Sequence, residues 1–368
     1  MNKKLIAVAV AGACAAPAAM AQTANPVTLY GIVYATFESV EANGGPSTAT
    51  PIVRRNRVSD QASRLGVRGT EDLGGGLKAF FQLETAFKPD QNDTTFAARN
   101  SAVGLQGGWG SVLLGRWDTP FKIATTAIDP LGDVTLGGFS AAMNGSGLRN
   151  EFQSFDRRDQ NVIQYWSPTW GGLAFRLHHS VNEGRTATLN PKNSSASITY
   201  TGGPIYVGYA YDEKKDAAFG AAATGATVVT LPKQQGHAIF GTVTFGPLKV
   251  GAAAEKFKRN GFSDQKAYAA NLVWTLGNNQ LIYQFQKAKD GEASGIEAPD
   301  CKVNTLAWQY NFSRRTWVQA QYTKVDNNAT SWCAFGASPF RTATFAAGPQ
   351  EVAGQNPKGI SLGIRHSF

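Results

Sequence analysis

The chain has 368 residues, a formal net charge of +9, 42% hydrophobic residues, 3 cysteines and 4 histidines. After the first 21 residues no run of about 18 or more apolar residues occurs, so a membrane-spanning helix is not expected. Lysine and arginine are scattered along the chain without a clustered patch, which argues against a nucleic-acid partner. The polarity pattern of the individual segments must therefore decide the class of protein.

Residues 1–21 have the features of a secretory signal peptide. Lys3 and Lys4 form a basic start, residues 5–16 are apolar, and Ala19-Met20-Ala21 fits the small-x-small rule before a cleavage site. The apolar run is short for a membrane anchor. The residues before Cys14 lack the leucine of a lipoprotein signal. We expect a signal peptide over residues 1–21 and one domain over residues 22–368.

Sixteen segments are predicted to be strands because apolar and polar side chains alternate along them, and seven tight turns join most of them in pairs. In chain order these segments span residues 27–40, 63–73, 77–87, 98–106, 111–117, 161–166, 173–181, 196–201, 205–212, 237–245, 248–256, 266–276, 280–287, 303–312, 316–325 and 359–368. The other connections are mostly longer, including a loop at 41–59 and an irregular segment at 118–156. Because boundaries predicted in this way shift by several residues, a count of roughly 14 or 18 strands also fits.

The hairpin at residues 63–87 shows most clearly what kind of sheet this is. Leu65 and Val67 lie on one face of its first strand, and Arg64 and Arg68 lie on the other. Long charged side chains on the second face suit a water-filled interior, and apolar side chains on the first suit lipid. Because the pattern recurs to the end of the chain without helices, it predicts a closed barrel that spans a membrane.

The late strands support a lipid-facing exterior. Their apolar faces carry aromatic residues near the strand ends, as is typical of side chains at a membrane interface. The last strand alternates up to the terminal Phe368, which resembles the assembly signal of outer-membrane barrels. The alternative is an aromatic-rich β-sandwich, although a single sandwich of this length with strands of about ten residues would be unusual.

An enzymatic barrel would need a catalytic constellation at one rim. His178 and His179 are adjacent, so on a strand they face opposite sides of the sheet. His366 lies on the apolar face of the last strand, and the chain has no HExxH, CxxC or P-loop pattern. We therefore expect no enzyme activity, no cofactor and no metal.

Several segments identify a family. The motifs VTLYG at 27–31, SRLGVRGTEDLGGGLKA at 63–79, SVLLGR at 111–116, NVIQYWSP at 161–168 and the closing RHSF resemble the general porins of β-proteobacteria, including the neisserial porins. This resemblance implies an all-β, 16-stranded antiparallel transmembrane β-barrel in the bacterial outer membrane, with short periplasmic turns and long external loops. It also implies a homotrimer and a third external loop folded into the lumen. Tyr34 departs from the family, which often has Asp there.

The narrowest part of such a pore selects ions by the charges that line it. We expect the infolded loop to be residues 118–156, carrying Asp118, Asp129 and Asp133. Alternation places Arg64 and Arg68 on the polar wall, and the resemblance adds Arg99 and Arg158 as pore arginines. Two positions conflict with strand alternation, since Arg99 shares parity with Val103 and Arg116 with Leu114. Arg99 would need a bulge or the end of regular pairing. Arg157 is an alternative to Arg158, and some of these arginines could instead bind lipopolysaccharide phosphates at the rim.

The resulting expectation is a general diffusion porin: a passive, water-filled channel for small hydrophilic solutes and ions, with a preference for anions. A substrate-specific channel or an adhesin-like barrel is the alternative. Outer-membrane lipid and lipopolysaccharide are the expected surroundings. After removal of the signal peptide two cysteines remain, Cys301 and Cys333, and in an exported chain they are expected to form a disulfide, the alternative being two buried thiols.

Overall fold

The computed structural model describes residues 27–46, 51–90, 94–132, 135–144, 155–219, 229–259, 264–290, 300–331, 333–336 and 353–368. The expected signal peptide lies outside these residues. Within them, almost all regular structure is strand, and no helix is long and apolar enough to cross a membrane. The strands are β1 (Thr28–Gly44), β2 (Ile52–Asp60), β3 (Arg64–Gly74), β4 (Leu77–Phe87), β5 (Thr94–Thr95), β6 (Ser101–Gly107), β7 (Gly110–Asp118), β8 (Arg158–Trp166), β9 (Leu173–Ser180), β10 (Lys192–Gly202), β11 (Ile205–Phe219), β12 (Val229–Phe245), β13 (Leu248–Arg259), β14 (Gln265–Leu276), β15 (Asn279–Asp290), β16 (Cys301–Asn311), β17 (Thr316–Asn327) and β18 (Gln355–Ser367).

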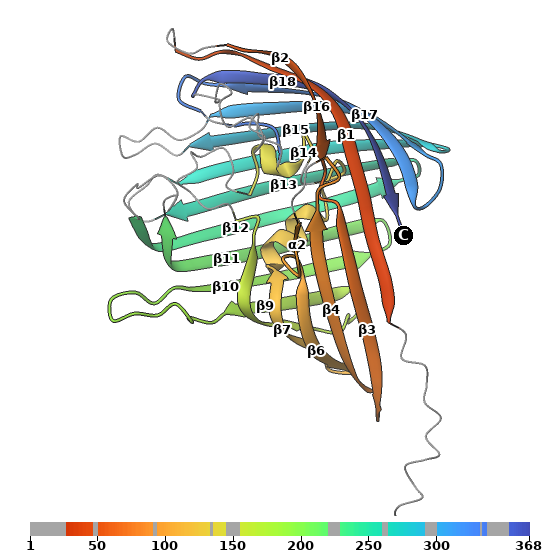
Figure 1. The fold of residues 1–368 in the computed structure, drawn as a ribbon, viewed down its shortest axis with the longest axis vertical. Helices are drawn as coiled ribbons and strands as arrows, with labels where there is room; N and C mark the ends of the chain where they lie inside the picture. The colour runs from red at the N-terminus through yellow and green to blue at the C-terminus, as the bar shows by residue number, and fades with distance from the viewer. Residues whose placement is uncertain are drawn as a thin grey trace, which may run out of the picture.

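These segments form one closed antiparallel barrel (Figure 1). β2 and β3 both pair with β1 and are two parts of one barrel strand, as are β5 and β6, which both pair with β4. The described segments therefore make sixteen barrel strands. β18 pairs with β1 from Ile32–Ser367 to Gly44–Gln355 and closes the ring. The prediction of a 16-stranded antiparallel barrel is confirmed.

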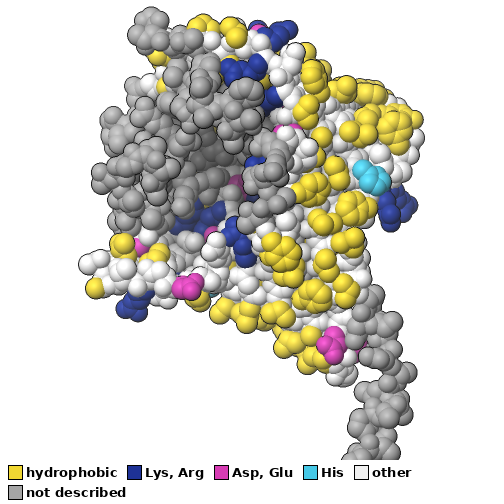
Figure 2. Space-filling model, viewed as in Figure 1, with side chains coloured by type: hydrophobic (Ala, Val, Ile, Leu, Met, Phe, Trp, Pro, Cys, Tyr) yellow, Lys and Arg dark blue, Asp and Glu magenta, His cyan; other side chains and the backbone are white. Residues whose placement is uncertain are grey.

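Alternation decides which side chains face lipid. Along β14, Tyr268, Leu272 and Trp274 are exposed on the outside, whereas Gln265 and Asn271 are buried on the inside. Figure 2 shows hydrophobic side chains spread over the outer wall and lysine and arginine side chains within the hollow. Apolar side chains in a lipid-facing position need no protein partner, which is why many large ones are exposed here.

The loop expected at 41–59 is largely strand. β1 continues to Gly44 and β2 begins at Ile52, so the two form a hairpin, and β18 pairs with β1 along the same stretch as far as Gly44. Charged cross-strand partners hold it: Arg57 Nε lies 2.7 Å from Glu38 Oε2, and Arg54 Nη2 lies 3.1 Å from Glu41 Oε1. The sequence pattern missed this strand because its arginines leave it without a continuous apolar face.

The segment 118–156 also contains regular structure that the pattern missed. It includes the helix α2 (Pro120–Thr126) and the short 3₁₀ helix η2 (Phe139–Ala141). With seven residues, α2 is too short to show helical periodicity. Its beginning does have a local signature, because Pro120 follows Thr119, whose side chain accepts a hydrogen bond from the Lys122 backbone N–H.

Candidate functional site

The infolded segment packs against the inside of the barrel, where Figure 1 shows α2 surrounded by strands. α2 contacts β9 to β12, and the Phe121 backbone N–H donates to Ser195 Oγ of β10 at 3.1 Å. Phe121, Phe155 and Phe257 form an aromatic cluster with ring centroids 4.8 to 6.1 Å apart. This apolar core fixes the loop within the lumen, as expected for the third external loop.

The tip of the loop is held by amide side chains of the wall. Gln284 Nε2 donates to the Gly137 carbonyl at 2.9 Å, and Gln286 Nε2 donates to the same carbonyl at 2.7 Å. Asn271 Nδ2 donates to the Ile128 carbonyl at 3.0 Å. These bonds satisfy loop carbonyls that would otherwise be buried without a partner. They also set the position of the loop across the pore.

Asp129 organises the loop from within. Its carboxylate accepts hydrogen bonds from the backbone N–H groups of Leu131 at 3.0 Å and Phe139 at 2.7 Å. Both oxygens are therefore engaged by the loop's own backbone, which differs from the pore-facing position expected for this residue. Asp133 lies outside the described residues.

Three of the expected pore arginines lie together on the wall beside the loop. Arg99 Nε lies 2.7 Å from Glu84 Oε1, and Arg64 Nε lies 3.7 Å from Glu84 Oε2. Arg158 Nη2 lies 3.0 Å from Asp118 Oδ1. The side chains are partly exposed, with 30% of Arg64, 21% of Arg99 and 12% of Arg158 accessible. They remain within reach of a solute in the lumen.

The structure explains how two arginines reach this site against their strand parity. β6 begins only at Ser101, so Arg99 precedes regular pairing and its side chain is free to turn inward. β7 has a register shift between Gly115 and Trp117, and Arg116 Nε donates from this bulge to the Ala98 carbonyl at 2.7 Å. A β-bulge re-aims the side chains next to it.

Lys122 is a site residue that the sequence reasoning missed. It lies on α2, and its Nζ is 2.7 Å from Asp156 Oδ1 and 3.7 Å from Asp118 Oδ1. Asp118 was expected to face the arginines as an acidic counterpart. Asp118 lies beside Arg158, one of the expected pore arginines, and Lys122 shares it, so the loop contributes a cation here as well as carboxylates. The only available signal was the position of Lys122 three residues after the helix-capping Thr119.

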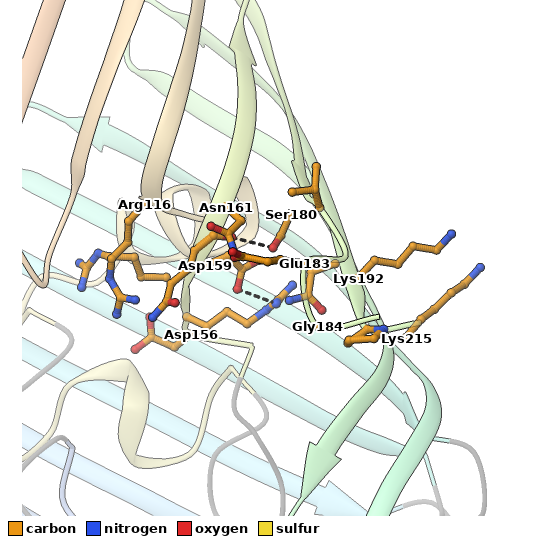
Figure 3. Close-up of a pocket in the computed structure, with 15 residues that line it drawn as sticks. Arg116, Asp156, Asp159, Asn161, Ser180, Glu183, Gly184, Lys192 and Lys215 are labelled. Atoms are coloured by element: carbon orange, nitrogen blue, oxygen red, sulfur yellow. Dashed lines mark hydrogen bonds and ion pairs between the residues drawn. The ribbon is translucent and has the colours of Figure 1, made fainter. Parts of the chain in front are cut away.

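Arg157 and Arg158 have different positions despite being neighbours. Arg157 forms ion pairs with Asp212 at 2.7 Å and with Asp159 at 2.8 Å, and 11% of its side chain is exposed. A cavity of about 830 Å³ lies beside these residues (Figure 3) and also touches Arg116, Asn161 and Lys192. Arg157 thus links Asp159 of β8 to Asp212 of β11 at the edge of this cavity. Arg158 instead pairs with Asp118 and belongs to the group of Arg64 and Arg99.

Arg68 lies apart from this cluster, near the rim with the short turns. Its guanidinium lies 5.0 Å from the ring centroid of Tyr30. Two other inward arginines at the same rim are also stacked, Arg176 over Trp166 at 5.2 Å and Arg365 over Trp317 at 5.6 Å. Among the described residues these three arginines have no carboxylate within ion-pair distance. The lumen therefore has paired arginines at its middle and arginine–aromatic pairs at this end.

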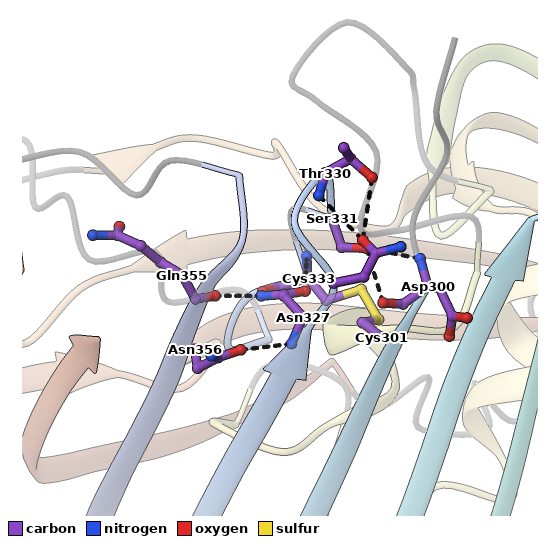
Figure 4. Close-up of a disulfide and its surroundings, with 9 residues drawn as sticks. Asp300, Cys301, Asn327, Thr330, Ser331, Cys333, Gln355 and Asn356 are labelled. Atoms are coloured by element: carbon purple, nitrogen blue, oxygen red, sulfur yellow. Dashed lines mark hydrogen bonds between the residues drawn. A yellow bond between two sulfur atoms is a disulfide. The ribbon is translucent and has the colours of Figure 1, made fainter. Parts of the chain in front are cut away.

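A disulfide lies in the same apolar cluster as Leu136 and Ala141 of the loop tip. Cys301 and Cys333 are bonded, with their Cα atoms 6.3 Å apart (Figure 4). Asn327 holds the second cysteine, since its Nδ2 donates to the Cys333 carbonyl at 2.9 Å and its Oδ1 accepts from the Cys333 N–H at 3.1 Å. The Gly336 N–H donates to the Leu136 carbonyl at 3.3 Å. The segment after Cys333 thus ties the loop tip to the wall.

Replacing both cysteines with serine is expected to lower the free energy of unfolding by about 2–4 kcal/mol, because the crosslink closes a long loop. Thermal unfolding followed by circular dichroism, with and without reductant, measures this. Reductant should lower the midpoint of the wild type and leave the C301S/C333S variant unchanged. Equal midpoints for wild type and variant under oxidising conditions would contradict the prediction.

Comparison with known proteins places this architecture in a family. The family model described as Gram-negative porin matches residues 7–330. The chain belongs to the Gram-negative porin family. Outer membrane porin protein 32 of Delftia acidovorans is 31% identical to this porin over the full length of both chains. The major outer membrane protein P.IB of Neisseria meningitidis serogroup A is 28% identical, covering 86% of this chain and 91% of the relative.

A solved structure shows the same architecture. The anion-selective porin from Comamonas acidovorans superposes with a TM-score of 0.73 at 25% identity, covering 94% of this porin and all of that chain. The porin is therefore an outer-membrane channel protein, in agreement with the expected family and location. The matched proteins named here are porins and outer-membrane proteins. Among the described residues no group of His, Cys, Asp or Glu side chains is arranged to hold a metal ion.

Proposed function

We propose that this porin prefers anions and that the basic cluster beside the infolded loop is its selectivity site. The observation that carries the proposal is an excess of cations at one level of the lumen. The cations are Arg64, Arg99, Arg116, Arg158 and Lys122, and the carboxylates that face them are Glu84, Asp118 and Asp156. In a narrow passage with low-dielectric walls, such an excess raises the local concentration of anions.

The proposed role differs in one respect from the sequence-based expectation. A field between wall arginines and the loop residues Asp118, Asp129 and Asp133 was expected. Asp118 pairs with Arg158 but also with Lys122 of the loop, and Asp129 accepts backbone hydrogen bonds. The selectivity site is therefore a cationic cluster that includes the loop residue Lys122. The likeness to a porin named as anion-selective also supports a preference for anions.

Single-channel recording across a planar bilayer under a potassium chloride gradient tests this proposal. We expect stable ohmic conductance and a reversal potential on the anion side. A cation-sided potential would overturn the assignment of the dominant charges while leaving the porin a channel. Absence of conductance from folded protein would favour the adhesin-like alternative.

A substrate-specific channel is the second candidate, and one observation favours it. The arginine–aromatic pairs at the short-turn rim present a guanidinium beside a ring, which could recognise aromatic anions. A specific channel would show saturating, solute-dependent block by such an anion, whereas a general one would pass solutes according to size and charge.

We propose in addition that the porin assembles as a homotrimer, as its family resemblance implies. The outer wall exposes large apolar side chains that lipid or neighbouring protomers can cover. Conductance steps grouped in threes, together with light scattering in detergent, measure the number of protomers. A monomer by both measurements would contradict the trimer and leave the selectivity site unaffected.

A further inference from the structure

A group of lysines gathers on the outside of the barrel, at the rim opposite the short turns. We call Lys256, Lys266, Lys287, Lys289 and Lys302, on β13 to β16, the lysine belt. Strand register makes them direct neighbours: Lys256 is opposite Lys266, and Lys266 is opposite Lys289. Lys287 is opposite Lys302. The belt is thus two adjoining rows of like charges on one face of the sheet.

Alternation places these side chains outside the lumen. In β14 Lys266, Tyr268, Ala270 and Leu272 are exposed, and the residues between them are buried on the side of the loop. In β16, Lys302 is exposed between the buried residues Cys301 and Val303. The belt is therefore separate from the selectivity site, whose charges point inward.

The belt is poorly neutralised by the protein. Lys256 Nζ lies 3.0 Å from Asp264 Oδ2. Lys302 is opposite Asp326, but that carboxylate lies 2.7 Å from Lys324 Nζ. In the described part of the chain, Lys266, Lys287, Lys289 and Lys302 have no carboxylate within ion-pair distance. Because like charges directly opposite each other destabilise a sheet, this arrangement costs stability unless an external anion binds.

The position of the belt indicates where that anion comes from. One step along the strands from Lys266 and Lys287, Tyr268 on β14 and Phe285 on β15 have the same outward parity, and further along lie Leu272 and Tyr283, which are opposite each other. Residues two apart on a strand are separated by about 7 Å. The lysines therefore lie just above the aromatic and apolar band, at the level of the lipid headgroups of the external leaflet.

We propose that the lysine belt binds the phosphate groups of lipopolysaccharide, the glycolipid of the external leaflet. Several adjacent cations favour a lipid with more than one negative charge over a phospholipid with a single charge. Each ammonium group donates charge-assisted hydrogen bonds to phosphate oxygens, and a bound phosphate cancels the repulsion between opposite lysines. The proposal rests on the outer-membrane location of the porin and is independent of its ion selectivity.

Binding of purified lipid A to the full-length porin in neutral detergent tests the site. The variant K266Q/K289Q should bind bisphosphorylated lipid A at least about tenfold more weakly than wild type, since two charge-assisted contacts are lost. The control K78Q/K249Q removes two lysines near the short turns and should bind as wild type does. Dephosphorylated lipid A should bind equally weakly to all three proteins.

The thermal midpoint provides a second readout, in which the effect changes sign. Without lipid A, K266Q/K289Q should unfold at a higher temperature than wild type, because like charges have been removed. With saturating lipid A the order should reverse. Equal binding of phosphorylated and dephosphorylated lipid A, equal losses in the control variant, or tighter binding of phosphatidylglycerol vesicles than of lipid A would each overturn the proposal. Conductance under a salt gradient should be unchanged in K266Q/K289Q, so failure of this proposal is distinguishable from failure of the selectivity site.

Discussion

Replacing Arg99 and Arg158 together with glutamate is expected to move the reversal potential of the channel to the cation side. The change removes two of the five cations at the selectivity site and adds two carboxylates to Glu84, Asp118 and Asp156. Two unit charges about 4 Å apart interact by about 4 kcal/mol at an effective dielectric constant of 20. A change of four charge units within this one cluster is therefore expected to outweigh the scattered charges of the mouth and rims.

The measurement is the reversal potential in a potassium chloride gradient, with R314E as control. Arg314 lies exposed in a short turn, outside the lumen constriction, so its replacement should leave the sign of selectivity unchanged. Because Arg99 and Arg158 also hold Glu84 and Asp118, the milder variant R99Q/R158Q should be measured as well and should give an intermediate potential. An anion-sided potential in folded R99E/R158E would rule out this cluster as the selectivity site.

Replacing Gly137 with alanine is expected to displace the loop tip and to destabilise the fold. A Cβ atom at Gly137 would contact Thr305 Oγ1 and lie 2.8 Å from Thr305 Cβ, both on the rigid wall. The tip must then move away from Gln284 and Gln286, whose amides hold its carbonyl groups. Overpacking and lost hydrogen bonds together are expected to cost about 2–4 kcal/mol.

Two measurements follow from this displacement, the thermal midpoint and the single-channel conductance. The midpoint should fall and the conductance should become larger or noisier, because the loop no longer holds one position. G108A is the matched control, since a Cβ at Gly108 meets no atom within 4 Å. Adding Thr305→Gly to Gly137→Ala should restore a steady conductance. A G137A channel identical to wild type would show that the tip tolerates movement without consequence for the pore.

The sequence was sufficient to predict the barrel because apolar and polar side chains alternate along most of its strands, although β7 is interrupted by a bulge. β14 is an example, where buried and exposed positions alternate residue by residue from Gln265 to Trp274. Alternation was insufficient above the apolar band, where β2 consists largely of polar residues on both faces. There, cross-strand ion pairs such as Glu38 with Arg57 maintain the strand, and such pairs depend on register that periodicity does not reveal.

The site was predictable only where a strand carries the residue. Arg64 follows strand parity, whereas Arg99 reaches the same cluster because regular pairing ends before it. The path of the loop depends on wall residues far away in sequence, such as Gln284, which bonds to Gly137. No local pattern could show that Asp129 would accept hydrogen bonds from the loop backbone or that Lys122 would form an ion pair with Asp156.

The apolar core beneath the infolded loop has a consequence for how substitutions affect this channel. The stretch of wall from β11 to β14 is covered by Phe121, Phe139 and Phe155, so its inner side chains do not meet the water column. Changes there, for example at Phe257, should alter folding yield and thermal stability but hardly the current. Changes on the uncovered arc that carries Arg64 and Arg99 should alter the current at little cost in stability. The inner surface thus has a part covered by the loop, where substitutions change stability, and a part that lines the pore, where substitutions change the current. A conductance screen of random variants would detect only substitutions in the second part.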